Sequence, residues 1–186
     1  MKLKFDNITV SGKIAVGTTT LSKHLQDILG WKHINAGFIQ REYDRTHNID
    51  ENKQGALSRS DNHEKEIDGM TKEILSTQKG LIYEAWLSGF MAQNIQRVCK
   101  VLLICSEEAV RIDRVVNREN ITVEEAKNRI KQREMENIAK WKKLYGDYDF
   151  WSPHFYDLVI DTYSSGQMET VGKVLDKLGH KIHITR

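Results

Sequence analysis

The sequence predicts an α/β protein of one domain, built around a parallel sheet of five strands. Short β-type runs alternate with longer amphipathic stretches, which is the order of β–α–β units. The chain has 186 residues, about the length of a single domain that buries its own core. It contains 12 Gly and one Pro, with no visible repeat or linker, so a low-complexity chain is excluded.

The strands and helices are expected where the hydrophobic period changes. The β-type runs lie at residues 8–10, 32–34, 81–83, 100–105 and 158–160. The amphipathic stretches lie at residues 19–29, 38–45, 62–77, 107–118, 122–144 and 167–178.

Helix ends and excursions from the sheet can also be predicted. Gly30, Gly80 and Gly179 each follow a helical stretch, where a left-handed C-terminal cap is expected. Residues 43–77 and 118–145 are polar or charged excursions, and the second is expected to form a charged helical hairpin. In sheets of this type such excursions hold substrates or act as lids.

Composition and charge exclude several classes of function. The chain has 28 Lys and Arg against 26 Asp and Glu, and a net charge of +2 predicts no nucleic-acid partner. The longest apolar run, residues 101–105, is far short of the roughly 20 residues that cross a bilayer, so no membrane partner is expected. The N-terminus has no apolar signal core, and Cys99 and Cys105 are expected to be reduced. We therefore expect a cytoplasmic protein.

The most informative motif lies between residues 8 and 20. A β-type run is followed by Gly12 and then by Gly17, and Thr19 opens an amphipathic stretch. Such glycines let successive backbone N–H groups turn toward an anion, and the following helix adds its positive N-terminal end. The motif therefore predicts a phosphate-binding loop, with the Thr19 hydroxyl in position to hold Mg²⁺.

Position 18 departs from the usual form of this motif. A lysine that bridges the phosphates normally stands there, and this chain has Thr18. Lys13 could reach over the phosphates from earlier in the loop and replace part of the lost charge. Its side chain could equally point into solvent, and the residues leave both alternatives open.

The loop resembles that of the P-loop nucleoside monophosphate kinases, most closely their archaeal-type cytidylate kinase-like branch. In that branch the loop has the sequence Gly-Pro-Pro-Gly-Ser-Gly-Thr-Thr-Thr. Residues 17–20 match the end of this sequence, and the branch likewise lacks the lysine that is missing at position 18. Residues 13–16 replace its Pro-Pro-Gly-Ser, which predicts a less flexible loop. The resemblance implies a three-layer α/β sandwich of the P-loop NTPase type that uses ATP and Mg²⁺. The implied ATP-binding residues are Gly12, Lys13, Ala15, Val16, Gly17, Thr18, Thr19 and Thr20.

The segment after the second predicted strand resembles the same family. Residues 34–41 are similar to its Ser-Ala-Gly-Glu-Ile-Phe-Arg element. This implies that Gly37 and Arg41 bind the acceptor monophosphate, and a forked guanidinium suits a phosphate dianion.

The third predicted strand carries another matching segment. Residues 81–92 are similar to the family's Val-Val-Val-Glu-Gly-Arg-Leu-Ser-Gly-Trp-Met, which implies that Glu84 joins Thr19 in organising Mg²⁺. Trp86 stands where the family has an arginine that contacts the monophosphate. The indole could stack on a base or serve packing, so this substitution bears on the acceptor more than on the fold.

The basic residues between 110 and 146 resemble the family's lid. The resemblance implies that Arg114, Arg118 and Arg133 clamp the transferring phosphoryl group. A single such helix would also be explained by solvated charge pairs such as Glu125 with Arg129. The resemblance further implies substrate contacts by Asp68, Asn137 and Lys140.

These segments together predict transfer of phosphate from ATP to a nucleoside monophosphate, most closely CMP or dCMP. The single domain of residues 1–186 would carry an acceptor-binding insertion at about 38–79 and a helical lid at about 118–145, and act as a monomer. Two alternatives stay open. Trp86 favours another small-molecule kinase on the same fold, and Thr18 favours a regulatory domain that binds a nucleotide without transfer.

Overall fold

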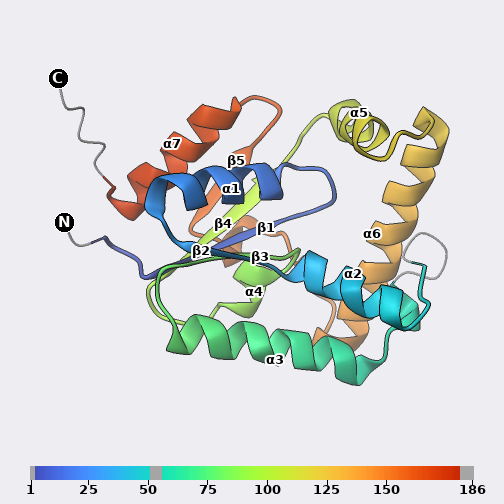
Figure 1. Ribbon diagram of the computed structural model, residues 1–186, viewed down its shortest axis with the longest axis horizontal. Helices are drawn as coiled ribbons and strands as arrows, with labels where there is room; N and C mark the ends of the chain where they lie inside the picture. The colour runs from blue at the N-terminus through green and yellow to red at the C-terminus, as the bar shows by residue number, and fades with distance from the viewer. Residues whose placement is uncertain (1–2, 51–55, 181–186) are drawn as a thin grey trace.

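The computed structural model describes residues 3–50 and 56–180, and their strands form one parallel five-stranded sheet (Figure 1). The sheet order is β2–β3–β1–β4–β5. In the central strand, Val10 is in register with Glu84 on one side and with Val101 on the other. The strand bounds are β1 (Asn7–Gly12), β2 (Lys32–Asn35), β3 (Leu81–Glu84), β4 (Val98–Ile104) and β5 (Leu158–Asp161).

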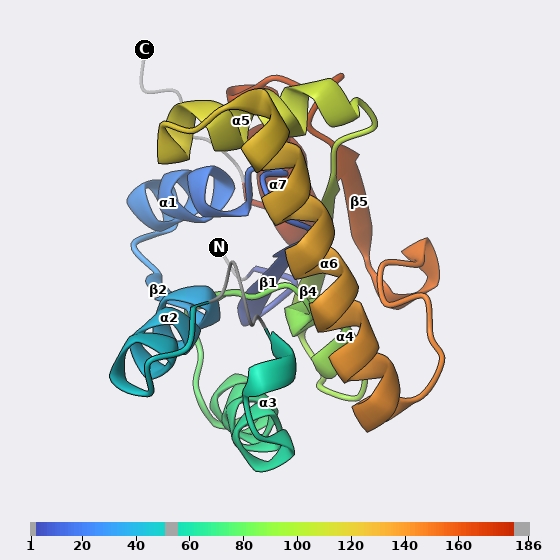
Figure 2. The ribbon, with the colours of Figure 1, turned by 90° about the vertical axis from the view of Figure 1, so that its right-hand side faces the viewer.

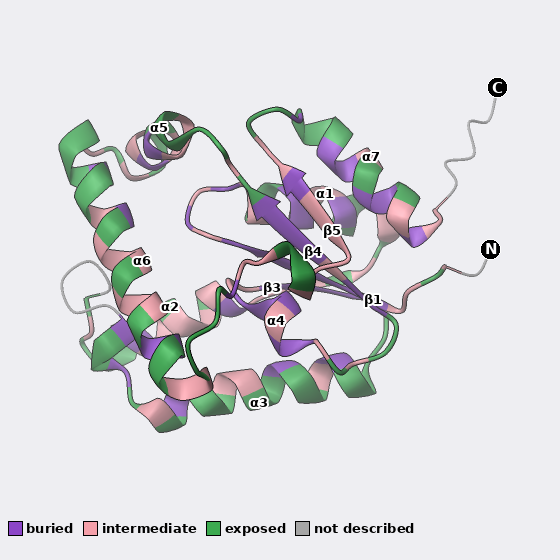
Figure 3. Cartoon of the chain, turned by 180° about the vertical axis from the view of Figure 1, so that it is seen from behind, coloured by how far each residue is buried: buried purple, intermediate pink, exposed green. Residues whose placement is uncertain are grey.

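Helices cover both faces of this sheet, which makes three layers (Figures 1 and 3). On one face α1 (Thr18–Leu29) and α7 (Gln167–Leu178) pack their apolar stripes onto the strands. The main core lies between them and includes Ile8, Val10, Leu21, Leu25, Val101, Leu103, Val174 and Leu178.

On the other face, α3 (Asp61–Thr77) and the short α4 (Ser88–Met91) lie against the sheet (Figures 1 and 3). Leu75 of α3 packs there with Tyr83 of β3. Because β1 is buried from both sides, its polar residues Asn7, Thr9 and Ser11 are enclosed together with Ile8 and Val10.

The remaining helices gather beyond the carboxyl ends of the strands, on the side opposite the termini (Figures 1 and 2). They are α2 (Ala36–Thr46), the 3₁₀ turn η1 (Ala56–Ser58), α5 (Glu108–Glu119) and α6 (Val123–Tyr145). The connection from β1 leads to β2 on one side of β1, and the connection from β3 leads to β4 on the other side of β1. The carboxyl end of β1 is therefore the switch point at which sheets of this kind bind ligands.

The predicted fold class and five-stranded parallel sheet are confirmed. The elements that the sequence missed are α4, η1 and η2 (Pro153–Phe155). Each is too short to show a helical period, so no pattern of apolar residues marks it. Residues 51–55 of the expected acceptor-binding insertion lie outside the described residues.

Two local predictions are wrong. Residues 118–145 do not form a hairpin, because residues 123–145 are one continuous helix, α6, which packs against α5. Glu125, the alternative ion-pair partner for Arg129, closes a capping box with Thr122, and Arg129 contacts Glu119. Gly80 has a left-handed φ of 72°, but α3 already ends at Thr77, so Gly80 turns the chain into β3.

Gly30 and Gly179 are the left-handed C-caps that the sequence predicts for α1 and α7. Among the helices that the structure describes, none has the length and the apolar composition needed to cross a membrane.

Candidate active site

Three adjoining cavities follow the carboxyl edge of the sheet in the described part of the chain. The central cleft lies over the loop between β1 and α1. The outer pocket lies between α1, α5 and the start of α7, and the inner cavity lies between α2, α3 and α6. Arg118 lines both the central cleft and the outer pocket, and Arg133 lines both the central cleft and the inner cavity. The cavities therefore form one continuous track.

The loop of residues 12–17 is folded tightly beneath the central cleft. A Cβ on Gly12 would lie 2.5 Å from Val16 Cγ2 and 2.7 Å from the carbonyl oxygen of Leu103, so this position requires glycine. Gly17 has a left-handed φ of 97° and immediately precedes α1. The loop thus leads into a helix N-terminus, whose unpaired N–H groups and partial positive charge favour an anion.

Two arginines of α5 hold the carbonyl groups of this loop. Arg111 Nε donates to the Ile14 carbonyl at 3.0 Å, and an Arg114 NH1 group donates to the Ala15 carbonyl at 3.0 Å. Because the C=O and N–H of one peptide point in opposite directions, the attached amides point away from α5. Ala15 itself adopts a left-handed φ of 61°, where the resembling family has glycine.

Arg114 was predicted to clamp the transferring phosphoryl group, and in the structure its guanidinium helps to hold this loop. Its guanidinium also donates to Thr162, at 3.1 Å to Oγ1 and 3.2 Å to the carbonyl oxygen. Arg114 therefore holds the loop against the residue that follows β5, and it also lines the outer pocket. Val16, predicted to bind ATP, has its side chain in the main core, whereas Thr20 lines the outer pocket as expected for an ATP contact.

Glu84, at the end of β3, joins the elements around the cleft. Its Oε1 accepts hydrogen bonds from Thr18 at 2.9 Å and Thr19 at 2.6 Å. Its Oε2 accepts from Asn35 at 2.8 Å and lies 2.9 Å from His33 Nε2. Sequence reasoning missed His33 and Asn35. Asn35 follows a β-type run and caps α2, and this capping pattern was the signal available for it.

The pKa of Glu84 lies below its ordinary value. Burial alone would raise this pKa, but hydrogen bonds from His33, Thr19 and Thr18 stabilise the ionised form and outweigh the burial. An ionised carboxylate beside the Thr19 hydroxyl is an oxygen donor set of the kind that Mg²⁺ prefers together with phosphate oxygens. The described residues contain no cluster of three or more His, Cys, Asp or Glu side chains that could hold a metal alone.

Lys13 lines the central cleft, with its Nζ 4.9 Å from the centre of the Trp151 ring. This is a cation–π distance, so the ammonium rests on an aromatic face rather than in open solvent. The two alternatives for Lys13, replacement of the charge missing at Thr18 or no contact with the phosphates, stay untested.

Trp86 lies between the central cleft and the inner cavity and lines both. Its ring also packs near the rings of Trp141, at 5.6 Å between centroids, and Trp151, at 6.3 Å. The residue therefore has a packing role, and one part of its surface borders the space where an acceptor would lie.

The inner cavity contains most of the predicted acceptor contacts. Gly37 and Arg41 line it from α2, Asp68 from α3 and Asn137 from α6. Asp68 also accepts a hydrogen bond from Tyr145. Burial raises the pKa of Asp68 to about 6, and the bond from Tyr145 only partly offsets this.

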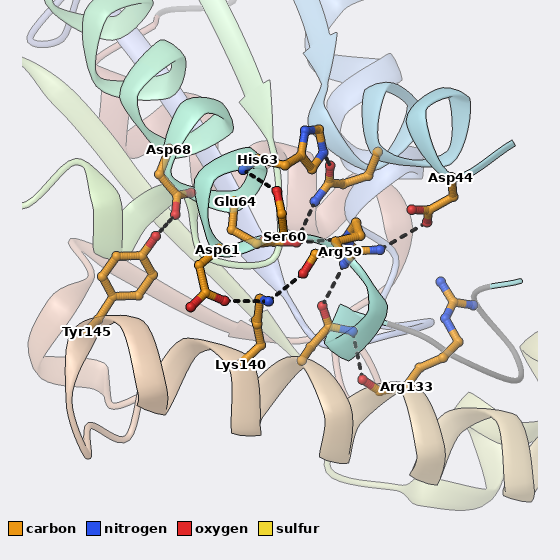
Figure 4. Close-up of polar contacts among 12 residues, drawn as sticks. Asp44, Arg59, Ser60, Asp61, His63, Glu64, Asp68, Arg133, Lys140 and Tyr145 are labelled. Carbon is orange, nitrogen blue, oxygen red and sulfur yellow. Dashed lines mark hydrogen bonds and ion pairs between the residues drawn. The ribbon is translucent and has the colours of Figure 1, made fainter. Parts of the chain in front are cut away.

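Sequence reasoning missed Arg59, which lines the same cavity. Its Nε donates to Glu64 at 2.6 Å and its NH1 group donates to Asp44 at 3.0 Å, and all three side chains are buried (Figure 4). No local pattern marks this arginine, because its partners lie on α2 and α3 rather than beside it in sequence.

Lys140 was predicted to contact substrate, but the structure places it away from the three cavities. Its side chain is 4% exposed and lines none of the three cavities. Lys140 Nζ instead donates to the Arg59 carbonyl at 2.5 Å and pairs with Asp61 at 2.7 Å. The pattern of basic residues on α6 could not reveal which of them faces a carboxylate of α3.

The fold and the site together define a kinase-type P-loop domain. A solved gluconokinase from Sinorhizobium meliloti 1021 shares the fold, with a TM-score of 0.60 and 12% identity, covering 94% of this chain and 91% of that one. An amide-rich loop at the switch point, with arginines along the adjoining cavities, is the arrangement that phosphoryl transfer requires.

The chain belongs to the cytidylate kinase-like family, whose model matches residues 7–164. A protein of Pyrococcus abyssi named cytidylate kinase is 34% identical over 179 residues, which cover 94% of this chain and 96% of that one. A protein of Pyrococcus furiosus with the same name is 36% identical over 156 residues, covering 83% and 79%. The resemblance identified from the sequence motifs is thereby confirmed.

The raised pKa of Asp68 predicts a pH-dependent loss of stability. Between pH 3.8 and about 6 the folded chain holds a proton that the unfolded chain has released, so stability falls as pH rises through this window. Asp68→Asn removes this loss, and we expect its free energy of unfolding at pH 7 to exceed that of the wild type by roughly 1–3 kcal/mol.

Urea denaturation at pH 4 and pH 7 measures this difference, with Asp113→Asn on the exposed face of α5 as the control. The control is expected to leave the free energy of unfolding within about 0.5 kcal/mol of wild type. An Asp68→Asn variant that is less stable than wild type at pH 7 would contradict the cost assigned to this partly buried carboxylate.

Proposed function

We propose that this chain transfers the terminal phosphoryl group of ATP to a nucleoside monophosphate, with CMP or dCMP as the acceptor. The observation that carries the proposal is the continuous track from the outer pocket, over the phosphate loop, into the inner cavity. A donor and an acceptor bound along this track would meet above the N-terminus of α1. The relatives named cytidylate kinase support the choice of acceptor.

The donor would occupy the outer pocket and the central cleft. The loop amides and the N-terminus of α1 would hold its phosphates, and Arg118, which lines both spaces, would neutralise charge on them. The Thr19 hydroxyl and the Glu84 carboxylate lie 2.6 Å apart and would hold Mg²⁺. When bound, Mg²⁺ would offset the negative charge of the phosphates.

The acceptor would occupy the inner cavity. Arg41 and the backbone at Gly37 would hold its phosphate, and Asp68 and Asn137 would contact its base or ribose. Arg133 lines both the inner cavity and the central cleft, so its guanidinium would lie where the phosphoryl group passes between the substrates.

Such a site needs no covalent intermediate. Alignment of the acceptor oxygen with the terminal phosphate and stabilisation of the developing charge supply most of the rate enhancement. Enclosure by α2 and α6 would exclude water and so limit hydrolysis of ATP. We retain three predictions as parts of the proposal: the acceptor insertion at about 38–79 with the lid at about 118–145, a monomeric state, and a cytoplasmic location.

A second candidate is a kinase of another small molecule, and Trp86 favours it. The indole lines the inner cavity where the resembling family has an arginine, so one positive charge toward the acceptor phosphate is missing. The buried guanidinium of Arg59 in the same cavity does not replace this charge, because it is already paired with Asp44 and Glu64.

Acceptor-dependent release of ADP tests the proposed function. We expect purified protein with Mg²⁺ and ATP to release ADP fastest with CMP or dCMP. The rate should exceed the rates with UMP and AMP by about tenfold or more, because the wrong base leaves buried polar groups of the site without hydrogen-bond partners. Faster release with gluconate or shikimate would support the second candidate. Tight ATP binding without acceptor-dependent release would support a regulatory domain and contradict the proposal.

Arg133→Ala is expected to lower kcat by at least about 100-fold while changing the Kd for ATP by less than about threefold. The reason is that a guanidinium at the junction of the two cavities acts chiefly on charge that develops during transfer. Steady-state kinetics and calorimetric titration with ATP measure the two quantities.

Arg129→Ala is the matched control, since Arg129 lies one turn earlier on α6, contacts Glu119 and lines none of the three cavities. Its kcat should stay within about threefold of wild type. Equal losses of kcat and ATP affinity in Arg133→Ala would refute a role in the transition state.

A further inference from the structure

The second half of α6 is fastened to the start of α3 by a buried lysine. Lys140 Nζ donates to the Arg59 carbonyl at 2.5 Å and pairs with Asp61 Oδ1 at 2.7 Å (Figure 4). Lys143 pairs with the other oxygen of Asp61 at 2.6 Å, but its side chain is 67% exposed. Tyr145 adds a hydrogen bond to Asp68, farther along α3.

Arg59 extends this fastening into the walls of the inner cavity. Its guanidinium binds Asp44 of α2 and Glu64 of α3, so both helices are held to one residue. A further N–H group of Arg59 lies 3.5 Å from Asn137 Oδ1 on α6. The segment that lines the acceptor side of the cavity is therefore tied to α6 as one unit.

The same contacts lead to Arg133. Asn137 Nδ2 donates to the backbone carbonyl of Arg133 at 2.7 Å, one turn earlier on α6. Asn137 thus links Arg59 to the helix backbone at Arg133 through two hydrogen bonds. Figure 4 shows the Arg133 side chain extending from α6 away from Lys140. A shift of the acceptor segment would thus be carried to the helix that bears Arg133.

Lys140 is more deeply buried than is needed to attach α6 to α3. Removing an ammonium from water is costly unless its geometry and partners compensate, and the exposed Lys143 already pairs with the same carboxylate. Lys140 lines none of the cavities, so its effect on ligands passes through the residues it binds, Arg59 and Asp61, and through α6. The neighbouring Trp141 packs against Trp86 at the end of β3, which fixes this part of α6 to the core.

We propose that Lys140 is a positioning residue that couples the binding of the acceptor to the binding of the nucleoside triphosphate. The proposal rests on the proposed function, which places the acceptor in the inner cavity and the triphosphate in the central cleft. An acceptor orders α2, Arg59 and Asn137, and this orders the part of α6 that carries Arg133. The triphosphate then meets a guanidinium that is already in place.

Coupling of this kind is measurable as a ratio of affinities. The Kd for a non-hydrolysable ATP analogue, AMPPNP with Mg²⁺, is measured by calorimetry without and with saturating CMP. We expect wild-type protein to bind AMPPNP at least about fivefold more tightly with CMP present. The Kd for CMP should fall by the same factor when AMPPNP is present, because coupling is reciprocal.

Lys140→Met removes the ammonium and retains most of the aliphatic stem. We expect the affinity ratio to fall to less than about twofold, while each ligand alone binds within about threefold of its wild-type Kd. Lys143→Met is the matched control, because it removes the exposed partner of the same Asp61 and should keep the wild-type ratio.

Thermal unfolding followed by circular dichroism shows whether each variant is folded at the assay temperature. If Lys140→Met is not folded, Asp61→Asn replaces it, since it removes the carboxylate partner at the helix start without changing the shape of the site. It is expected to lower the ratio at least twofold. A wild-type ratio in any folded variant of Lys140 or Asp61 would overturn the proposal.

The two proposals fail in different ways. If wild-type protein binds AMPPNP and CMP with a ratio of one, the coupling is wrong and the proposed function stands. If wild-type protein binds AMPPNP but no nucleoside monophosphate, the proposed function is wrong and the coupling falls with it.

Discussion

A buried carboxylate at the end of β3 holds the candidate active site together. Glu84 accepts hydrogen bonds from Thr18 and Thr19 at the start of α1 and from Asn35 at the end of β2, and it lies beside His33. These contacts fix the first turn of α1 relative to the neighbouring strands, and the arginines of α5 hold the preceding loop from its other side. A phosphate group is bound by several backbone amides at once, so the amides must be held in fixed positions. Any nucleotide chemistry at this edge of the sheet therefore depends on the fixed relative positions of the loop, the helix and the strands.

Much of the fold and part of the site could be predicted from local sequence. The glycines at positions 12 and 17 mark the loop because few other residues tolerate the close approach at one and the left-handed φ at the other. Arg41, Asp68 and Asn137 line one cavity, as the family resemblance implies. The sheet follows from apolar runs whose period is visible in the sequence.

What could not be predicted depends on contacts between residues far apart in the chain. The sequence shows several basic residues on α5 and α6 but not the direction of each. Arg114 turns to the loop carbonyls, Lys140 is buried against Asp61, and Arg133 borders two cavities. Arg59 and His33 carry no motif at all, because their roles arise only when α2, α3 and β3 are packed together.

If donor and acceptor bind along one track, a single molecule that joins the two nucleosides should fill all three cavities. In P¹-(5′-adenosyl) P⁵-(5′-cytidyl) pentaphosphate the two nucleosides are joined by a chain of phosphates. A crystal structure of the complex should place the adenosine in the outer pocket, the phosphates over residues 12–17 and the cytidine in the inner cavity between α2, α3 and α6. Phosphates bound away from the loop, or a cytidine outside the inner cavity, would show that the two substrates do not share this track.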